Sequence, residues 1–189
     1  MTSEPLGMET LNRIKKERIG AAEILAKSYS EYCSQNFSSP EHQKFILLKL
    51  QMSIIQFEIC SDILNVLRTE KSTFGRKVAL KSIIHKIFEY KKPLKAKHIK
   101  TIHDLAGSKS LEQEKNHLAA ISKNYRKIIN KIEQYNELRD VATAHYDPDI
   151  SKQIKAIESI DENEAIDLIR AFLLFKKDIT SLMRDIGKS

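Results

Sequence analysis

Apolar side chains recur every three or four residues along most of this chain, the spacing that places them on one face of an α-helix. The clearest case covers residues 40–70, with apolar positions at Phe45, Leu48, Met52, Ile55, Ile59, Ile63 and Val66. Ser39 before Pro40 has the form of a helix N-cap with proline at the first helical position. The pattern therefore predicts a helix that begins at residue 40.

The same spacing predicts helices over residues 8–34, 76–91, 94–106, 111–145, 149–159 and 162–186. We expect Pro93 to separate the third and fourth helices of the chain, because proline lacks the N–H group that a continuing helix uses. Capping-box patterns that start at Ser110 and Asp161 predict the starts of two later helices. Asp147-Pro148 predicts a helix end just before it. No stretch alternates as a strand would.

A second apolar set widens the stripe of the helix at residues 40–70, with members Leu47, Leu50, Ile54, Phe57, Leu64 and Leu67. A helix that is apolar on two sides lies in the middle of a bundle or at an interface between copies. Both explanations stay open. We predict an all-α fold, a single domain over residues 1–189. It is an antiparallel bundle of about four long helices plus one or two short ones, with residues 1–7 as a flexible tail.

The composition agrees with a globular protein, since 41% of the residues are hydrophobic and 30% are charged. The net charge of +7 would favour an anionic partner such as nucleic acid, although it also serves solubility. The densest basic stretch, residues 91–98, is expected to be a solvated face.

Cys33 and Cys60 are expected to be buried free thiols in a reducing compartment. With no signal-peptide pattern and no long apolar run, we expect a cytoplasmic protein that does not bind membranes.

An arginine stands where an apolar residue is expected near the end of the helix at residues 111–145. Counting four residues from the core position Tyr135 leads to Arg139, and continuing leads to Ala142 and Tyr146. A cation on a core-facing stripe must be paired, or must face a cleft or a partner. Such departures from a local pattern often mark functional sites. Arg139 is therefore a candidate functional residue.

His145 follows Arg139 by six positions, which on an ideal helix places the two side chains about 120° apart. They converge only if the helix unwinds before Asp147, or if two copies of the chain pool their residues across a symmetric interface.

Arg139, the polar Asp140, four further residues and then His145, near the end of a long helix, resemble the Arg-x5-His motif of the HEPN superfamily. Ala144-His145-Tyr146-Asp147 also looks like HEPN proteins of abortive-infection and toxin systems. The resemblance covers about seven residues. It implies an all-helical homodimer with two Arg–His pairs across the interface, and metal-independent endoribonuclease activity without a cofactor. Many members act in phage defence or toxin–antitoxin pairs, with a cognate antitoxin as a partner, and some only bind or scaffold.

The chemistry of these residues suits RNA cleavage. His145 is the expected acid–base group and Arg139 the phosphate clamp. Asp140 would orient one of them, or a residue of the partner chain. Tyr146 could stack on a base or bind phosphate, and Asn136 is a weaker RNA-binding candidate.

Structural roles also account for these residues. Arg139 could form an ion pair with Glu137 of a partner or with Asp167, and His145 could simply close its helix. The other open alternative is a non-catalytic HEPN-like bundle that binds RNA, a nucleotide or a protein.

His42, His85 and His117 are expected to be isolated surface residues, and the spacing of His98 and His103 does not fit paired zinc ligands. Phosphate-binding loops and nucleophile elbows are absent from the sequence.

Overall fold

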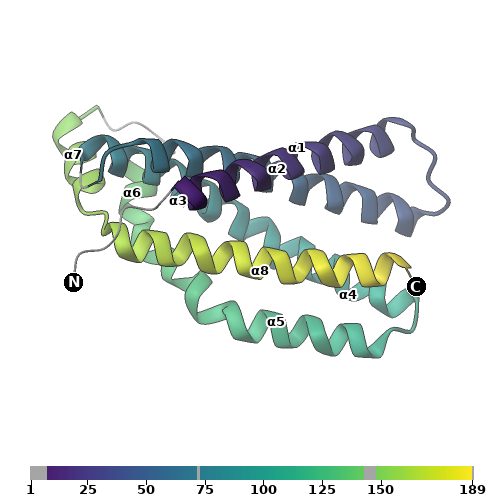
Figure 1. The fold of residues 1–189 in the computed structure, drawn as a ribbon. Helices are drawn as coiled ribbons and strands as arrows, with labels where there is room; N and C mark the ends of the chain where they lie inside the picture. Colours follow the sequence, from purple (N-terminus) through teal and green to yellow (C-terminus); the bar gives the residue numbers. More distant parts are fainter. Residues whose placement is uncertain (1–7, 72, 143–147, 189) are drawn as a thin grey trace. The chain divides into compact units, whose positions relative to one another are not determined.

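The computed structural model describes residues 8–71, 73–142 and 148–188, which form helices and short connections (Figure 1). The described helices are α1 (Met8–Cys33), α2 (Pro40–Arg68), α3 (Phe74–Pro93), α4 (Ile99–Ser108), α5 (Glu112–Asn130), α6 (Asn136–Ala142), α7 (Ile150–Glu158) and α8 (Glu162–Lys188). A π-helical turn, η1 (Leu94–His98), and a 3-10 turn, η2 (Lys131–Tyr135), join two pairs of them. No strand occurs in the described ranges. The prediction of an all-α helical bundle is confirmed.

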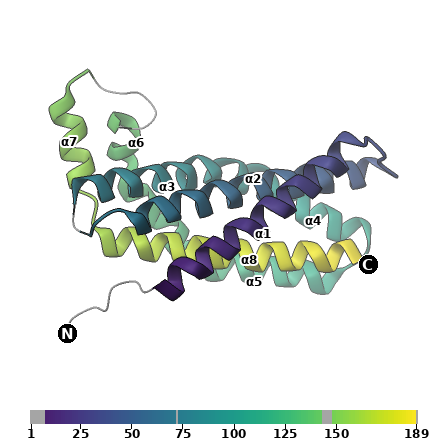
Figure 2. The ribbon, with the colours of Figure 1, turned by 45° about the horizontal axis from the view of Figure 1, so that its top comes forward.

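The chain forms two compact units, which meet in the sequence between Ile83 and Ile84. In the first unit, α1 and α2 run antiparallel and pack along each other (Figure 2). Ile59 and Cys60 of α2 are fully buried there, as are Leu80 and Ile83 of α3. The single domain predicted over residues 1–189 stays a prediction.

Helix α8 is the central element of the second unit, where it packs against α5 and α4. Its buried side chains recur at helical spacing and include Leu168, Phe172, Phe175, Ile179, Leu182 and Ile186. The ring of Phe172 meets Tyr90 of α3 edge-on, with ring centroids 5.8 Å apart. Tyr125 of α5 packs edge-on against Phe175 and donates a hydrogen bond of 2.8 Å to Asp178. These contacts place α3, α5 and α8 around one core.

Two of the three predicted N-caps are confirmed. Ser39 caps α2, because its hydroxyl accepts a hydrogen bond of 3.0 Å from the backbone N–H of His42. The carboxylate of Asp161 accepts one of 2.9 Å from the N–H of Glu164 at the start of α8. The capping box at Ser110 is wrong. Ser110 adopts a left-handed φ of 57° in the turn, and α5 begins two residues later.

α3 ends at Pro93 and the separate helix α4 follows, as predicted, but the chain stays helical between them through η1. The φ of −63° and ψ of −30° of Pro93 are helical, and Pro93 ends α3 without a break in the coil. The N–H of Ile99 reaches back to the carbonyl of Leu94, which is the wider spacing of a π turn. The wider π turn accommodates the ring and the missing donor of proline while the chain stays helical.

The helix predicted over residues 111–145 is also corrected. α5 ends at Asn130, the tighter turn η2 follows, and α6 begins at Asn136. The chain changes direction at η2, so that α5 and α6 do not share an axis (Figure 1). Because α6 packs against α7, tertiary contacts have prevailed here over a sequence whose apolar spacing is continuous.

The basic stretch at residues 91–98 is not a solvated face throughout, because Lys91 and His98 are buried. The ammonium of Lys91 forms an ion pair with Glu133 of η2. His98 shares a hydrogen bond of 3.2 Å between Nδ1 and the hydroxyl of Tyr90. Burial, followed by the charge of Lys97, lowers the pKa of His98 from 6.5 to about 4.

This buried histidine predicts a loss of stability in mild acid. Because the pKa of His98 is lower in the folded chain, the unfolded chain takes up the proton first as the pH falls from 6.5 to about 4. We expect His98 to remove up to about 3 kcal/mol of the free energy of unfolding over that window, and nothing above it. Urea denaturation at several pH values checks this. His98→Gln should show a correspondingly flatter pH dependence, and equal slopes for both proteins would contradict the prediction.

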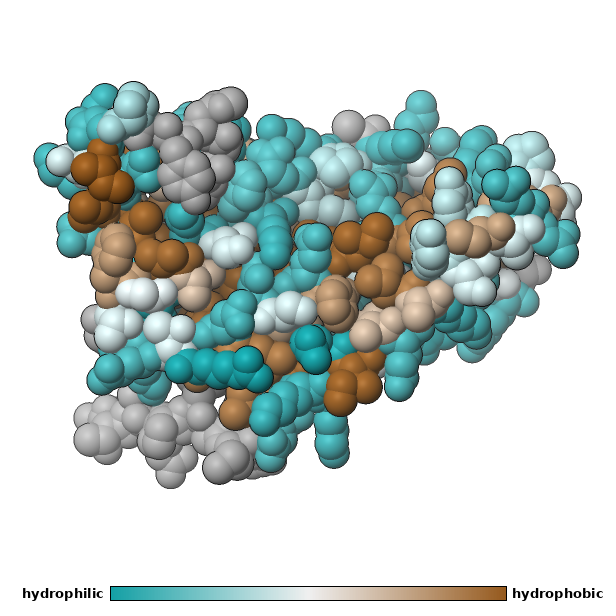
Figure 3. Space-filling model, turned by 90° about the horizontal axis from the view of Figure 1, so that it is seen from above, coloured by the Kyte–Doolittle hydropathy of each residue, from teal (hydrophilic) through white to brown (hydrophobic). Residues whose placement is uncertain are grey.

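Several large apolar side chains remain exposed. They lie on α1 (Ile19, Ile24, Tyr29), on α2 (Leu47, Ile54) and on α7 (Ile150, Ile154). Figure 3 shows brown side chains at the surface over α7, at its upper left. Cys33 is exposed, contrary to expectation, whereas Cys60 is buried as expected. By length and composition α2 could also cross a membrane, a test that core helices of soluble proteins pass as well.

Candidate functional site

The short helix α6 is held in place through η2, the turn that precedes it. The carboxylate of Glu133 accepts a hydrogen bond from the buried ammonium of Lys91, which ties η2 to α3. Gln134 donates a hydrogen bond of 3.2 Å to Glu164 of α8. Ile132 and Tyr135 of η2 are buried in the core of the second unit, and burial raises the pKa of the Tyr135 hydroxyl. Two hydrogen bonds and two buried side chains of η2 therefore fix the position at which α6 begins.

Arg139 projects from α6 onto an aromatic ring of α3. Its guanidinium carbon lies 4.7 Å from the centroid of Phe88, a distance typical of a cation–π contact. The Nε of Arg139 also donates a hydrogen bond of 2.7 Å to the carboxylate of Asp140, and a terminal nitrogen contacts the same oxygen. The Arg139 side chain is 27% exposed. The guanidinium is thus held in orientation by two neighbours and still reaches the surface.

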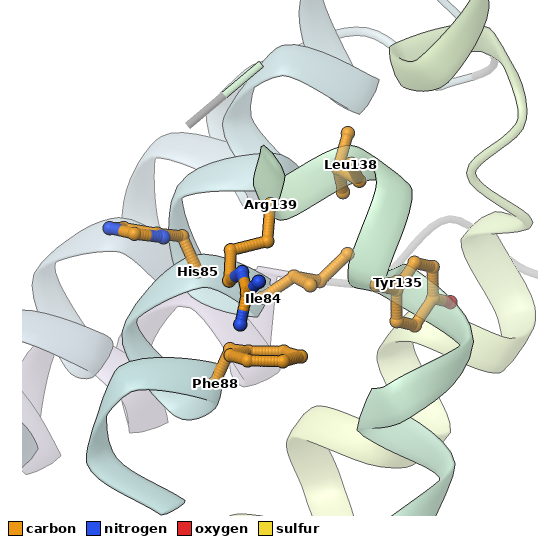
Figure 4. Close-up of a pocket in the computed structure, with 6 residues that line it drawn as sticks. All are labelled: Ile84, His85, Phe88, Tyr135, Leu138 and Arg139. Atoms are coloured by element: carbon orange, nitrogen blue, oxygen red, sulfur yellow. The ribbon is translucent and has the colours of Figure 1, made fainter. Parts of the chain in front are cut away.

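These residues border a narrow crevice between α3 and the segment formed by η2 and α6 (Figure 4). Its lining consists of Ile84, His85, Phe88, Tyr135, Leu138 and Arg139. The crevice is too narrow to hold a water molecule. It is a packed seam rather than a substrate cavity, so a ligand of Arg139 would have to approach the exposed part of the guanidinium from outside.

His85 is the residue that the sequence interpretation missed at this site. It is only partly exposed and lines the crevice, although we expected an isolated surface histidine. Its Nδ1 is buried and has no hydrogen-bond partner among the described residues. Figure 4 shows its ring pointing away from the guanidinium of Arg139. The available signal was its position between the apolar residues Ile84 and Phe88, on a helix with a wide apolar face.

The predicted site residues are brought together only in part. Arg139 and Asp140 are in contact, whereas Asn136 is exposed at the first position of α6. His145 and Tyr146, the expected acid–base group and its neighbour, lie outside the described residues. Asp167, the expected intrachain partner in the structural alternative, instead pairs with Arg170 at 3.4 Å. Arg139 takes its neighbour Asp140 in place of Asp167.

No protein-family model, curated protein or solved structure matches this chain. Inference about function therefore starts from the residues themselves. At this site they comprise a partly exposed arginine, a carboxylate that orients it and an aromatic surface beneath it. An arginine side chain held in this way and partly exposed has the planar geometry that suits a phosphate or a carboxylate.

Proposed function

We propose that this protein is a metal-independent endoribonuclease of the HEPN type, in which Arg139 binds the scissile phosphate. The observation that carries the proposal is the setting of Arg139. Its guanidinium rests on Phe88, bonds to Asp140 and remains partly exposed. A cation fixed before the substrate arrives stabilises a developing negative charge without reorganising. Asp140 then acts as the positioning residue that orients the guanidinium.

The proposed reaction uses the 2′-hydroxyl of the substrate as the nucleophile. Its oxygen forms a bond to phosphorus while the bond from phosphorus to the 5′-oxygen breaks. His145 takes the proton of the 2′-hydroxyl or delivers a proton to the departing 5′-oxygen, a role that suits a histidine near neutral pH. Arg139 stabilises the charge on the equatorial oxygens. The products are a 2′,3′-cyclic phosphate and a 5′-hydroxyl end, and no metal ion takes part.

The remaining features of the proposal follow from the resemblance in the segment from Arg139 to Asp147. They are a homodimer with two Arg–His pairs at its interface, a cytoplasmic location, and a role in phage defence or with a cognate antitoxin. The apolar residues exposed on α1, α2 and α7 are compatible with an interface between copies. Asn136 and Tyr146 are the proposed contacts to bases or phosphates flanking the scissile bond.

An RNA-cleavage assay in EDTA tests the proposal. We expect the wild-type chain to cleave single-stranded RNA and to leave 2′,3′-cyclic phosphate ends, and His145→Ala to lose at least about 100-fold in rate. His117→Ala is the matched control, because His117 is an exposed histidine of α5. It should cleave like the wild type.

Two outcomes would contradict the proposal. The first is cleavage by His145→Ala at the wild-type rate, and the second is cleavage that stops when EDTA is added. RNA binding without cleavage, in both the wild type and His145→Ala, would instead favour the non-catalytic binding protein.

A further inference from the structure

A groove of about 580 Å³ lies between α4 and α5 in the second unit. Its polar lining consists of Lys100, His103, Lys115, Ser122, Lys123 and Arg126. Ile99, Leu118 and Ala119 supply its apolar part. The groove shares no residue with the crevice at Arg139, and the sequence interpretation did not single it out.

Helical spacing explains how α5 forms one wall of the groove. Lys115, Ala119, Ser122 and Arg126 follow one another at intervals of three or four residues, so they lie on one face of the helix. At the rise of an α-helix, this face extends about 16 Å from Lys115 to Arg126. Lys100 and His103 face it from α4. The basic side chains are therefore arranged along a line rather than around a point.

The charge of the groove has one sign. Four of its lining residues are lysine or arginine, and none is a carboxylate. Lys100, Lys123 and Arg126 are exposed and have no ion-pair partner within the described ranges. Two carboxylates lie just beyond the lining: Glu112 pairs with Lys115 at 2.6 Å, and Asp104 lies 3.7 Å from His103. Three cations remain unneutralised along the groove.

Ser122 adds a second, independent indication of a ligand. Its hydroxyl oxygen is buried and has no hydrogen-bond partner in the described part of the chain. A buried hydroxyl without a partner is destabilising, and rotation of the Ser122 side chain toward the groove would let a ligand supply the missing hydrogen bond. Since Ser122 lines the groove midway between Ala119 and Arg126, that ligand would lie along the same face of α5.

We propose that the groove between α4 and α5 binds the sugar–phosphate backbone of a single-stranded nucleic acid. Spaced cations match successive phosphates, and the accessible apolar side chains of Ile99 and Ala119 offer a surface to bases that are unstacked only in a single strand. His103 is the only aromatic ring of the described lining, so the groove offers little stacking for bases. We therefore expect it to contact the sugar–phosphate backbone without preference for a base sequence. Binding here does not depend on the cleavage proposed at Arg139.

The test measures binding with a probe that cannot be cleaved through a 2′-hydroxyl. Fluorescence anisotropy of a 2′-O-methyl RNA of about 15 nucleotides is followed over a range of KCl concentrations. For the triple variant Lys100→Gln, Lys123→Gln, Arg126→Gln, we expect at least about tenfold weaker binding. The slope of log affinity against log salt should become shallower by about 2, from the loss of three phosphate contacts.

A variant that loses the same charge elsewhere distinguishes binding in the groove from non-specific electrostatic attraction. Lys15, Lys16 and Lys27 are exposed on α1, and their replacement by glutamine removes the same charge. This control should bind within about twofold of the wild type, because long-range attraction is screened by salt. An equal loss in both variants, or no loss in either, would overturn the proposal. Circular dichroism spectra confirm that each variant is folded.

A second variant adds charge instead of removing it. Ala119 is an exposed part of the lining, so Ala119→Glu places a carboxylate within the groove. We expect at least about threefold weaker binding, because the carboxylate repels phosphate. A single-stranded DNA probe of the same sequence shows which nucleic acid the groove binds. Equal affinities would mean that it binds both, and a higher affinity for RNA would mean that it is an RNA site. Preferential binding of poly-glutamate to the wild-type groove would overturn the nucleic-acid assignment.

Discussion

Replacement of Arg139 by lysine is expected to lower kcat/KM for RNA cleavage by at least about 100-fold, although the charge is retained. Lysine cannot reproduce the three things that the guanidinium does at once. The guanidinium lies over Phe88 and donates from Nε to Asp140, and the arginine side chain as a whole stays partly exposed. A flexible ammonium would offer the phosphate a point charge without a fixed orientation. The rate is measured in EDTA with an end-labelled RNA.

Arg170→Lys provides the control for this substitution. Arg170 is an exposed arginine of the second unit whose partner, Asp167, lies on the same helix. An exposed pair of this kind contributes little, so both activity and thermal stability should stay at the wild-type level. Wild-type rates for Arg139→Lys would remove Arg139 from the reaction. Unfolding of Arg139→Lys at a much lower temperature would assign Arg139 a structural role instead.

The largest effect on stability is expected from Phe172→Ala, which should lower the free energy of unfolding by about 3–5 kcal/mol. Phe172 is fully buried in α8 and meets the ring of Tyr90 edge-on. Truncation removes the transfer free energy of the ring and leaves a cavity that the surrounding helices fill only in part. The aromatic contact with Tyr90 is lost as well. Urea denaturation followed by circular dichroism measures the change.

Leu174→Ala, two residues along the same helix, is the matched control. Leu174 is 47% exposed, so its truncation should change the free energy of unfolding by less than about 0.5 kcal/mol. Similar losses in the two variants would mean that Phe172 does not lie at the centre of the core. A loss below about 1 kcal/mol for Phe172→Ala would lead to the same conclusion.

Local sequence was sufficient to predict most helices and two of their N-caps. The helices predicted over residues 8–34, 40–70, 149–159 and 162–186 differ from α1, α2, α7 and α8 by at most two residues at either end. This is because amphipathic spacing and caps act between residues close in the chain. Ser39 and Asp161 each bond to a backbone N–H three residues ahead, so a short stretch of sequence contains the whole interaction.

Pro93 and the segment after Asn130 show where local reasoning was insufficient. α3 ends at Pro93 as predicted, but a π turn keeps the chain helical up to α4, which no local pattern indicated. After Asn130 the apolar spacing is uninterrupted, yet the helix tightens and turns. The turn is held by Lys91 of α3 and Glu164 of α8, through Glu133 and Gln134 respectively. Both partners lie far away in the sequence, so no local pattern records them.

Some residues of the candidate site could be found from the sequence, and others only from the structure. Arg139 was identifiable from sequence, because an arginine on an apolar stripe needs a specific environment, and Asp140 is its neighbour in the chain. The ring of Phe88 beneath the guanidinium, and His85 beside it, come from another helix. The groove between α4 and α5 is likewise formed by two helices, neither of which has a basic run of its own.

The sequence by itself therefore determined the helical class of this protein, most helix limits and the unusual position of Arg139. These depend on backbone hydrogen bonds and side-chain spacing within a few residues. Only the tertiary structure decided that Arg139 rests on Phe88, that η2 redirects the chain, and that Lys100 faces Lys123 and Arg126 across a groove. Those arrangements arise because burying the apolar faces of separate helices brings distant residues together. The apolar spacing of a helix shows which face is buried, but not which other helix covers that face.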